Sequence, residues 1–187
     1  MHNINEFRKP DTKIDNIFTE RWSIRSFSEK TLNSLQISKL FESARWAPSS
    51  SNRQPWHFVY STSGKSRVKM NNILNEGNRI WAIKAPLLIF VYTKLQTNDG
   101  KTNFTAQFDA GAAWMSLAIQ ARLMGLYTHA MGGIDRSNAL ELVKSDNYHY
   151  QSICAVAVGY VDESKISKNP DEIPTQRISV NEFVKKL

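Results

Sequence analysis

The segment from Phe104 to Met124 constrains the fold of this 187-residue chain more than any other. It has the length of a long helix and is apolar almost all round, with small side chains from Ala110 to Ala113. A helix of this kind must be buried on most sides, either at the centre of a domain or against a second subunit. Four polar or charged residues interrupt the apolar run, which argues against a membrane span. Gly125 is placed to cap its C-terminal end.

The remaining patterns predict one domain over residues 1–187, in which residues 1–13 are polar and loosely held. A chain of this length with 41% hydrophobic residues can form one α/β or α+β domain with a substantial core. Apolar runs predict strands, of which 85–93 is the central one because it is apolar on both faces. The predicted strands are 56–62, 85–93, 127–131 and 151–158, and the predicted helices are 15–21, 31–47, 66–75, 104–124, one capped by Asp135, and one opened by the capping box 179–182. The stretch 162–176 shows no hydrophobic period.

Composition narrows the class of protein. The net charge of +7 permits nucleic-acid binding, but basic residues are scattered and their longest pure run is Lys185-Lys186. A basic nucleic-acid-binding protein is therefore an alternative that the pattern does not favour. Cys154 is the only cysteine, which excludes an intrachain disulfide and a cysteine zinc cluster. The N-terminus lacks the apolar stretch of a signal peptide, so we expect a cytoplasmic protein without a membrane partner.

A dense polar loop, Ala47 to Trp56, joins a predicted helix to a predicted strand. Its hydroxyls and amides suit hydrogen bonding to a polar small molecule, although the loop taken alone is more typical of an ordinary Ser/Asn-rich turn. Arg21, Arg25 and Arg177 lie in irregular segments, where arginine forks with Ser23 could hold a phosphate. Surface salt bridges are the alternative for each arginine taken singly.

Conventional catalytic groups are hard to assemble from this sequence. The four histidines are dispersed and have no metal-ligand spacing, and no Gly-x-Ser-x-Gly elbow supplies a serine nucleophile. Gly64-Lys65-Ser66 lacks the first glycine of a phosphate-binding P-loop, and no glycine-rich dinucleotide fingerprint occurs. We therefore expect neither a metal site nor a catalytic side chain, and a cofactor that carries the chemistry.

Two motifs near the N-terminus occur in a fixed order. RWSIRSF occupies residues 21–27 and ARWAPSSSNRQPW occupies residues 44–56. Shorter pieces follow at 85–86, 109–112, 131–135 and 158–160, and Arg177 comes last. With this order and spacing the chain resembles the nitroreductase family of FMN enzymes from about residue 14 to its end.

The resemblance implies an α+β, three-layer fold with a central mixed or antiparallel sheet flanked by helices. It also implies a homodimer with two FMN sites across the interface, in which helix 104–124 is the dimer core. The FMN-binding residues that it implies are Arg21, Trp22, Ser23, Arg25, Pro48, Ser49, Ser50, Asn52, Gln54, Asn78, Gly132, Gly133 and Arg177.

Each of these positions has an implied place around the flavin. Arg21, Ser23 and Arg25 approach the phosphate, the ribityl chain and the pyrimidine edge, and Arg177 joins them at the phosphate. Residues 48–52 reach in from the partner subunit, Asn78 lies on the pyrimidine side, and Gly132-Gly133 offers a backbone N–H to flavin N5. Trp22 replaces the family's usual arginine or histidine, so its contact is through the backbone. Gly132 replaces a proline or glutamate, which suggests an open pocket with broad acceptor tolerance.

The implied activity is an FMN-dependent oxidoreductase that uses NADH or NADPH to reduce nitroaromatic or quinone-type acceptors. The implied mechanism is ping-pong hydride transfer through flavin N5, with no catalytic side chain. A flavin-binding module without reductase activity is an alternative. Dehalogenation, enone reduction and flavin fragmentation are others, because family members with these activities share the same motifs.

Overall fold

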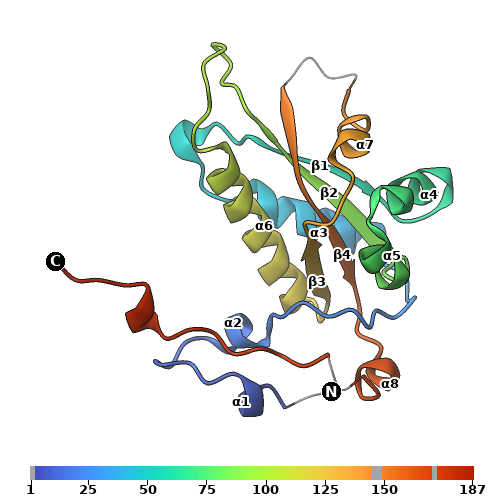
Figure 1. Ribbon diagram of the computed structural model, residues 1–187, viewed down its shortest axis with the longest axis vertical. Coiled ribbons are helices and arrows are strands. Elements are labelled where there is room, and N and C mark those ends of the chain that lie inside the picture. The colour runs from blue at the N-terminus through green and yellow to red at the C-terminus, as the bar shows by residue number, and fades with distance from the viewer. Residues whose placement is uncertain (1–2, 145–148, 170–171) are drawn as a thin grey trace.

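The structure, a computed structural model, describes residues 3–144, 149–169 and 172–187. The sheet and the longer helices form the body of the molecule, and the short helices and extended segments of both chain ends lie together at one side of it (Figure 1). The elements are α1 (Ile4–Phe7), α2 (Asn16–Glu20), α3 (Ser34–Arg45), the 3-10 turn η1 (Ser50–Asn52), β1 (Trp56–Ser61), α4 (Gly64–Ile73), α5 (Glu76–Ala82), β2 (Leu87–Lys94), α6 (Ala106–Leu123), β3 (Tyr127–Met131), α7 (Arg136–Leu140), β4 (Tyr150–Gly159), α8 (Glu163–Ile166) and the 3-10 turn η2 (Val180–Glu182).

The four strands form one sheet in the order β1-β2-β4-β3. Every strand pairing among the described residues is antiparallel, so the sheet is antiparallel and not mixed. The predicted central strand is confirmed, since β2 lies between β1 and β4 and its first seven residues are buried. The other three predicted strands are confirmed to within a residue or two of their ends.

The alternation of side chains along β2 separates two hydrophobic cores. Leu87, Ile89 and Val91 face the core formed with α3 and α6. Leu88, Phe90 and Tyr92 face the opposite core, which contains residues of α4, α5 and the segment 22–27. Successive residues of a strand point to opposite faces, so a run apolar at every position fits a sheet covered on both sides. Helices on both faces give the three layers that were predicted (Figure 1).

Helix α6 uses only part of its apolar surface within the chain. Ala113, Leu117 and Ala121 are buried in the core that α6 shares with α3 and the sheet. On the opposite side, Phe108 is 81% exposed, and just before the helix Phe104 is 93% exposed. The predicted C-terminal cap is confirmed, because Gly125 follows the last turn with φ of +73°, a conformation that glycine adopts without strain. Within one chain, therefore, a large apolar surface of α6 has no cover.

Three helices were not predicted, and all three are short. The helix predicted over 66–75 is α4, which ends at Ile73 because Leu74 adopts extended backbone and bridges to Ile134. A separate helix, α5, follows at once. Helices α1 and α8 have four residues each and are started by the side chains of Asn3 and Asp162, so they contain too few residues to show a hydrophobic period.

The two ends of the chain lie side by side, as the blue and red segments in Figure 1 show. Gln176 donates to the carbonyl of Lys9 and accepts from the N–H of the same residue. Further along, the carboxylate of Asp11 accepts from the hydroxyl of Ser179 and from the N–H of Val180, both at 2.8 Å. Much of the segment 3–13 is thus hydrogen-bonded to the C-terminal segment. No helix of the described residues has the length and apolarity needed to cross a membrane.

Replacing Gly159 by alanine should destabilise the fold. A Cβ at this buried position would lie 2.5 Å from Cδ of Pro86 and 3.2 Å from Cδ1 of Phe27, and the proline ring has little freedom to move. We expect a loss of about 1–3 kcal/mol in the free energy of unfolding, the usual range for overpacking. Gly77→Ala is the matched control, because nothing lies within 4 Å of its Cβ and it sits in α5. Urea denaturation of both variants measures the difference, and equal stabilities would contradict the prediction.

Candidate functional site

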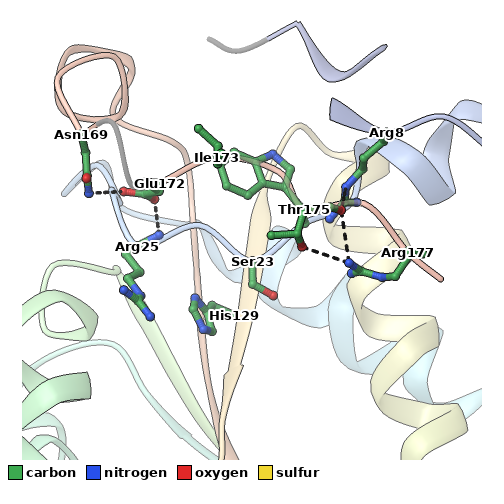
Figure 2. A pocket seen from close by; sticks show the side chains of 10 residues that line it. Arg8, Ser23, Arg25, His129, Asn169, Glu172, Ile173, Thr175 and Arg177 are labelled. Carbon is green, nitrogen blue, oxygen red and sulfur yellow. Dashed lines mark hydrogen bonds between the residues drawn. The ribbon is translucent and has the colours of Figure 1, made fainter. Parts of the chain in front are cut away.

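A cavity of about 230 Å³ lies where the segment 22–25, strand β3 and the C-terminal segment meet. Figure 2 shows Arg8, Thr175 and Arg177 gathered at one end, with Arg25, His129 and Glu172 toward the other. An adjoining, more apolar cavity of about 440 Å³ shares Arg8 and Arg177 and is also lined by Arg21. The residues that line the first cavity are Arg8, Trp22, Ser23, Arg25, His129, Asn169, Glu172, Ile173, Thr175 and Arg177.

The segment 22–25 presents alternate side chains to the cavity and to the core. Trp22 and Ile24 are buried, and Trp22 packs edge-on against Tyr127 with ring centroids 6.5 Å apart. Ser23, which lies between them, and Arg25, which follows Ile24, are exposed. Since extended backbone alternates its side chains, burial of the two apolar residues fixes the direction of the two polar ones. The hydroxyl of Ser23 and the guanidinium of Arg25 make no hydrogen bond to any described residue, so both donors are available to a ligand.

A buried carboxylate joins the C-terminal segment to this motif. Glu172 accepts hydrogen bonds from the N–H of Arg25, from the N–H of Ser26 at 2.8 Å and from the Ser26 hydroxyl at 2.6 Å. Only 6% of its surface is exposed. Hydrogen bonds to an ionised acceptor are about twice as strong as neutral ones. Glu172 thereby fixes one end of the segment that carries Thr175 and Arg177 into the cavity.

Three arginines concentrate positive charge at the other end. The buried Arg8 donates to the carbonyls of Thr19 and Arg21, both at 2.9 Å, and of Thr175 at 3.0 Å. Its pKa falls to about 10, first because it is buried and then because Arg177 and Arg21 repel its charge. Burial and the charge of Arg177 also lower the pKa of Arg21. The charges that act on this group are all positive, which makes it a place for an anion.

Asn78, Gly132 and Gly133 were also predicted to bind the flavin, but none of them is among the residues that line the two cavities. The side-chain amide of Asn78 donates to the carbonyl of Gly133 at 3.0 Å, and a Cβ on Gly133 would lie 2.6 Å from the Asn78 amide nitrogen. Gly132 and Gly133 directly follow β3, the strand that carries His129 into the cavity. Their N–H groups make no hydrogen bond to any described residue. The structure therefore brings Asn78 and Gly133 together. In the sequence, Gly133 follows shortly after His129, which lines the cavity.

The predicted residues of the 48–54 loop do not line the cavity. Pro48, Ser49, Ser50, Asn52 and Gln54 lie between α3 and β1, where the N–H of Ser50 is within 3.3 Å of both carboxylate oxygens of the buried Asp109 on α6. Ser51, Asn52 and Gln54 have φ of 51°, 53° and 48°, in the left-handed region that non-glycine residues rarely occupy. Several such residues in succession cost about 1–3 kcal/mol each and occur mainly at functional sites.

Sequence reasoning missed several cavity residues. Arg8 lies in a polar segment with no motif, and only its burial in the structure indicates a role. His129 was treated as one of several dispersed histidines, of which His2 lies outside the described residues. The C-terminal lining residues lie in the stretch 162–176, which shows no hydrophobic period. The sequence signal in this stretch was a carboxylate and a threonine shortly before Arg177. These residues are Arg8, His129, Asn169, Glu172, Ile173 and Thr175. Among the described residues no group of His, Cys, Asp and Glu could hold a metal ion.

Comparison with known proteins identifies relatives over most of the chain. A family model described as "Nitroreductase family" matches residues 18–160. A solved structure described as an oxidoreductase containing FMN is 34% identical, with a TM-score of 0.89, and the match covers 100% of this chain and 97% of that one. A protein of Archaeoglobus fulgidus with the provisional name NADH dehydrogenase/NAD(P)H nitroreductase is 26% identical over 80% of this chain and 85% of its own length. An FMN-dependent nitroreductase from Clostridium difficile is 22% identical with a TM-score of 0.67, covering 79% of this chain and 87% of that one, and shows the fold alone.

Removing the carboxylate of Glu172 should loosen the cavity wall. Glu172→Ala leaves the Ser26 N–H and hydroxyl buried without a partner, so we expect a loss of about 2–4 kcal/mol in the free energy of unfolding. Glu172→Gln keeps one acceptor oxygen and should lose about 1 kcal/mol. Glu163→Ala, at an exposed position on α8, is the control and should change stability by less than about 0.5 kcal/mol. Urea unfolding would refute this account if Glu172→Ala matched the control.

Proposed function

The chain belongs to the nitroreductase family, and from this membership and the cavity we propose that it is an FMN-dependent oxidoreductase. It takes reducing equivalents from NADH or NADPH and passes them to nitroaromatic or quinone-type acceptors in a second, separate half-reaction. The observation that carries the proposal is the cavity itself, which combines an uncompensated arginine cluster with unpaired hydrogen-bond donors. An anion with a long polar chain and a planar ring, as in FMN, matches this set of groups.

The residues present fit the phosphate end of FMN. Arg8, Arg21 and Arg177 repel one another, and a phosphate dianion would relieve that repulsion. Arg177 is exposed and its other contacts are with Thr175 and its own neighbouring carbonyl, so its guanidinium can turn to a ligand without breaking a buried pair. Arg8 is held by three backbone carbonyls and would act as a fixed charge behind the phosphate.

The remaining donors suit the polyol chain and the ring. Among the described residues the Ser23 hydroxyl and the Arg25 guanidinium have no hydrogen-bond partner, and both side chains line the same cavity. Gly132 and Gly133 have unpaired N–H groups beyond the end of β3. When bound, FMN supplies the hydride chemistry at N5. The side chains and backbone N–H groups of this chain hold and orient the cofactor, and the cation of Arg25 favours negative charge on the ring.

We also propose that two copies of the chain complete each site. The exposed side of α6, with Phe104, Phe108, Met115 and Leu123, adjoins a groove of about 490 Å³ along the same helix. An exposed apolar surface of this kind is typical of a subunit interface. The 48–54 loop is attached to α6 through Asp109 and lies away from the cavity of its own chain. Pairing through α6 would allow residues Pro48, Ser49, Ser50, Asn52 and Gln54 to reach the cavity of the other copy.

The proposed activity predicts a yellow protein that NADH or NADPH bleaches without oxygen. The measurement is an absorbance spectrum of the purified protein, followed by anaerobic titration with each nucleotide and then with a nitroaromatic and a quinone. Return of the oxidised spectrum on adding an acceptor would support reductase activity. A yellow protein that neither nucleotide bleaches would indicate a flavin-binding module. A colourless protein that takes up no added FMN would overturn the proposal.

Replacing Arg177 should weaken the binding of FMN much more than the binding of riboflavin. A charge-assisted hydrogen bond contributes about 1.5–3 kcal/mol, so we expect Arg177→Gln to raise the Kd for FMN by about 10- to 100-fold. The Kd for riboflavin, which has no phosphate, should change by less than about twofold. Arg45→Gln is the control because Arg45 pairs with Glu42 on the surface of α3. Fluorescence titration measures both ligands, and an equal loss for both would show that Arg177 does not contact the phosphate.

A charge on the exposed side of α6 should separate the subunits. Phe108→Glu would place a carboxylate in the proposed apolar interface, and we expect a monomer in sedimentation velocity together with weaker FMN binding. Val68→Glu is the control, since Val68 is also an exposed apolar residue but lies on α4. Wild-type protein that sediments as a monomer would rule out the dimer.

A further inference from the structure

His129 lines the cavity in a fixed position, and the FMN-binding residues implied by the family do not include it. Its ring packs at a tilt against the indole of Trp81, with centroids 4.5 Å apart and planes 34° apart. On another side, Nδ1 lies 2.7 Å from the carbonyl oxygen of Ile24. The ring is therefore held by α5 and by the segment 22–25 while it lines the cavity beside Ser23 and Arg25 (Figure 2).

The carbonyl of Ile24 determines the tautomer of this histidine. A carbonyl oxygen can only accept, so Nδ1 must carry the proton and donate it. In the neutral ring Nε2 then has a lone pair and acts as an acceptor. Nε2 makes no hydrogen bond to any described residue. The three arginine side chains that line the cavity can only donate, so Nε2 adds an acceptor for a hydroxyl or N–H of a ligand.

The surroundings favour the neutral ring. Burial is the largest effect and lowers the pKa of His129 below its ordinary value of 6.5, and the charge of Arg25 lowers it further. The Ile24 carbonyl and the charge of Glu172 act in the opposite direction without reversing the shift. At neutral pH, Nε2 is thus an acceptor in a fixed orientation.

We propose that Nε2 of His129 accepts a hydrogen bond from a hydroxyl of the flavin's ribityl chain. The role rests on the proposed FMN function. His129 lies beside Ser23 and Arg25, away from the arginine cluster that fits the phosphate (Figure 2). A polyol hydroxyl both donates and accepts hydrogen bonds, so the Ser23 hydroxyl and His129 Nε2 can both hydrogen-bond to the ribityl chain.

Two substitutions separate the acceptor from the rest of the ring. The amide of His129→Asn can reach the Ile24 carbonyl in place of Nδ1 but offers nothing at the position of Nε2. His129→Gln can place an amide oxygen near the position of Nε2. Loss of one neutral hydrogen bond corresponds to about 3- to 10-fold in Kd. We therefore expect Kd for FMN and riboflavin to rise by about that factor in His129→Asn and to change by less than about twofold in His129→Gln.

Lumiflavin, which has the ring system without the ribityl chain, is the ligand control. Its Kd should be the same in wild type and both variants, because the proposed bond is missing from all three complexes. Equal losses of lumiflavin and riboflavin affinity in His129→Asn would overturn the role, since the histidine would then act through the ring pocket or the fold. Unchanged riboflavin binding in His129→Asn would overturn it as well. Wild-type protein that binds none of the three flavins would instead overturn the proposed FMN function.

A pH titration with riboflavin gives a second, independent readout. Protonation places a hydrogen on Nε2 and turns the acceptor into a donor, and riboflavin carries no phosphate that the new charge could attract. Riboflavin affinity of the wild type should fall as pH drops through the lowered pKa of His129, below 6.5, and the profile of His129→Gln should stay flat. ¹⁵N NMR of the free protein should show the neutral ring protonated at Nδ1. A ring protonated at Nε2, or identical pH profiles, would contradict the proposal.

Discussion

The carboxylate of Glu172 joins two parts of the chain that are 147 residues apart, and the shape of the cavity depends on this contact. Its hydrogen bonds to the N–H groups of Arg25 and Ser26 and to the Ser26 hydroxyl hold this motif against the segment that leads to Arg177. Strand β3 contributes His129 to the lining of the same cavity. Each wall of the cavity comes from a different region of the sequence, so the cavity exists only when the N-terminal motif, the sheet and the C-terminal segment are all in place. Binding and folding are coupled in such a site, because a ligand that binds only the folded state stabilises it.

Electrostatic repulsion is the cost of this arrangement. Among the described residues Arg8 hydrogen-bonds to three backbone carbonyls, and the charges that act on it are those of Arg177 and Arg21. A cluster of like charges destabilises the folded chain until an anion compensates it. The arginine cluster lies at the end of a cavity, where a bound anion would compensate its charge. The buried Arg67 shows the contrast, since it donates to Ser61, Ala82 and Ala85 carbonyls and serves to hold α4 and α5.

The sequence predicted the fold well where patterns are long. Strand β2 is apolar at successive positions and α6 is apolar almost all round for five turns, so both were identified with nearly correct ends. Of the short helices, α2 and α7 were predicted and α1, α5 and α8 were missed, because segments of four to seven residues contain too few residues for a clear period. At the site, Ser23, Arg25 and Arg177 lie on one cavity, and Asn78 meets Gly133. Arg8, Glu172 and His129 were missed because their importance comes from burial and long-range contacts that no local pattern records.

The 48–54 loop contains predicted site residues that lie away from the cavity of their own chain. Its strained residues Ser51, Asn52 and Gln54 persist because neighbouring contacts hold them, among them the approach of Ser50 to the buried Asp109. Asp109 lies in the first turn of α6, the helix whose outer side is apolar and exposed. The same helix therefore positions the loop and offers the surface for a second copy. In the dimer that we propose, a shift of α6 would move the loop with it, so subunit pairing would be linked to the geometry of the proposed site.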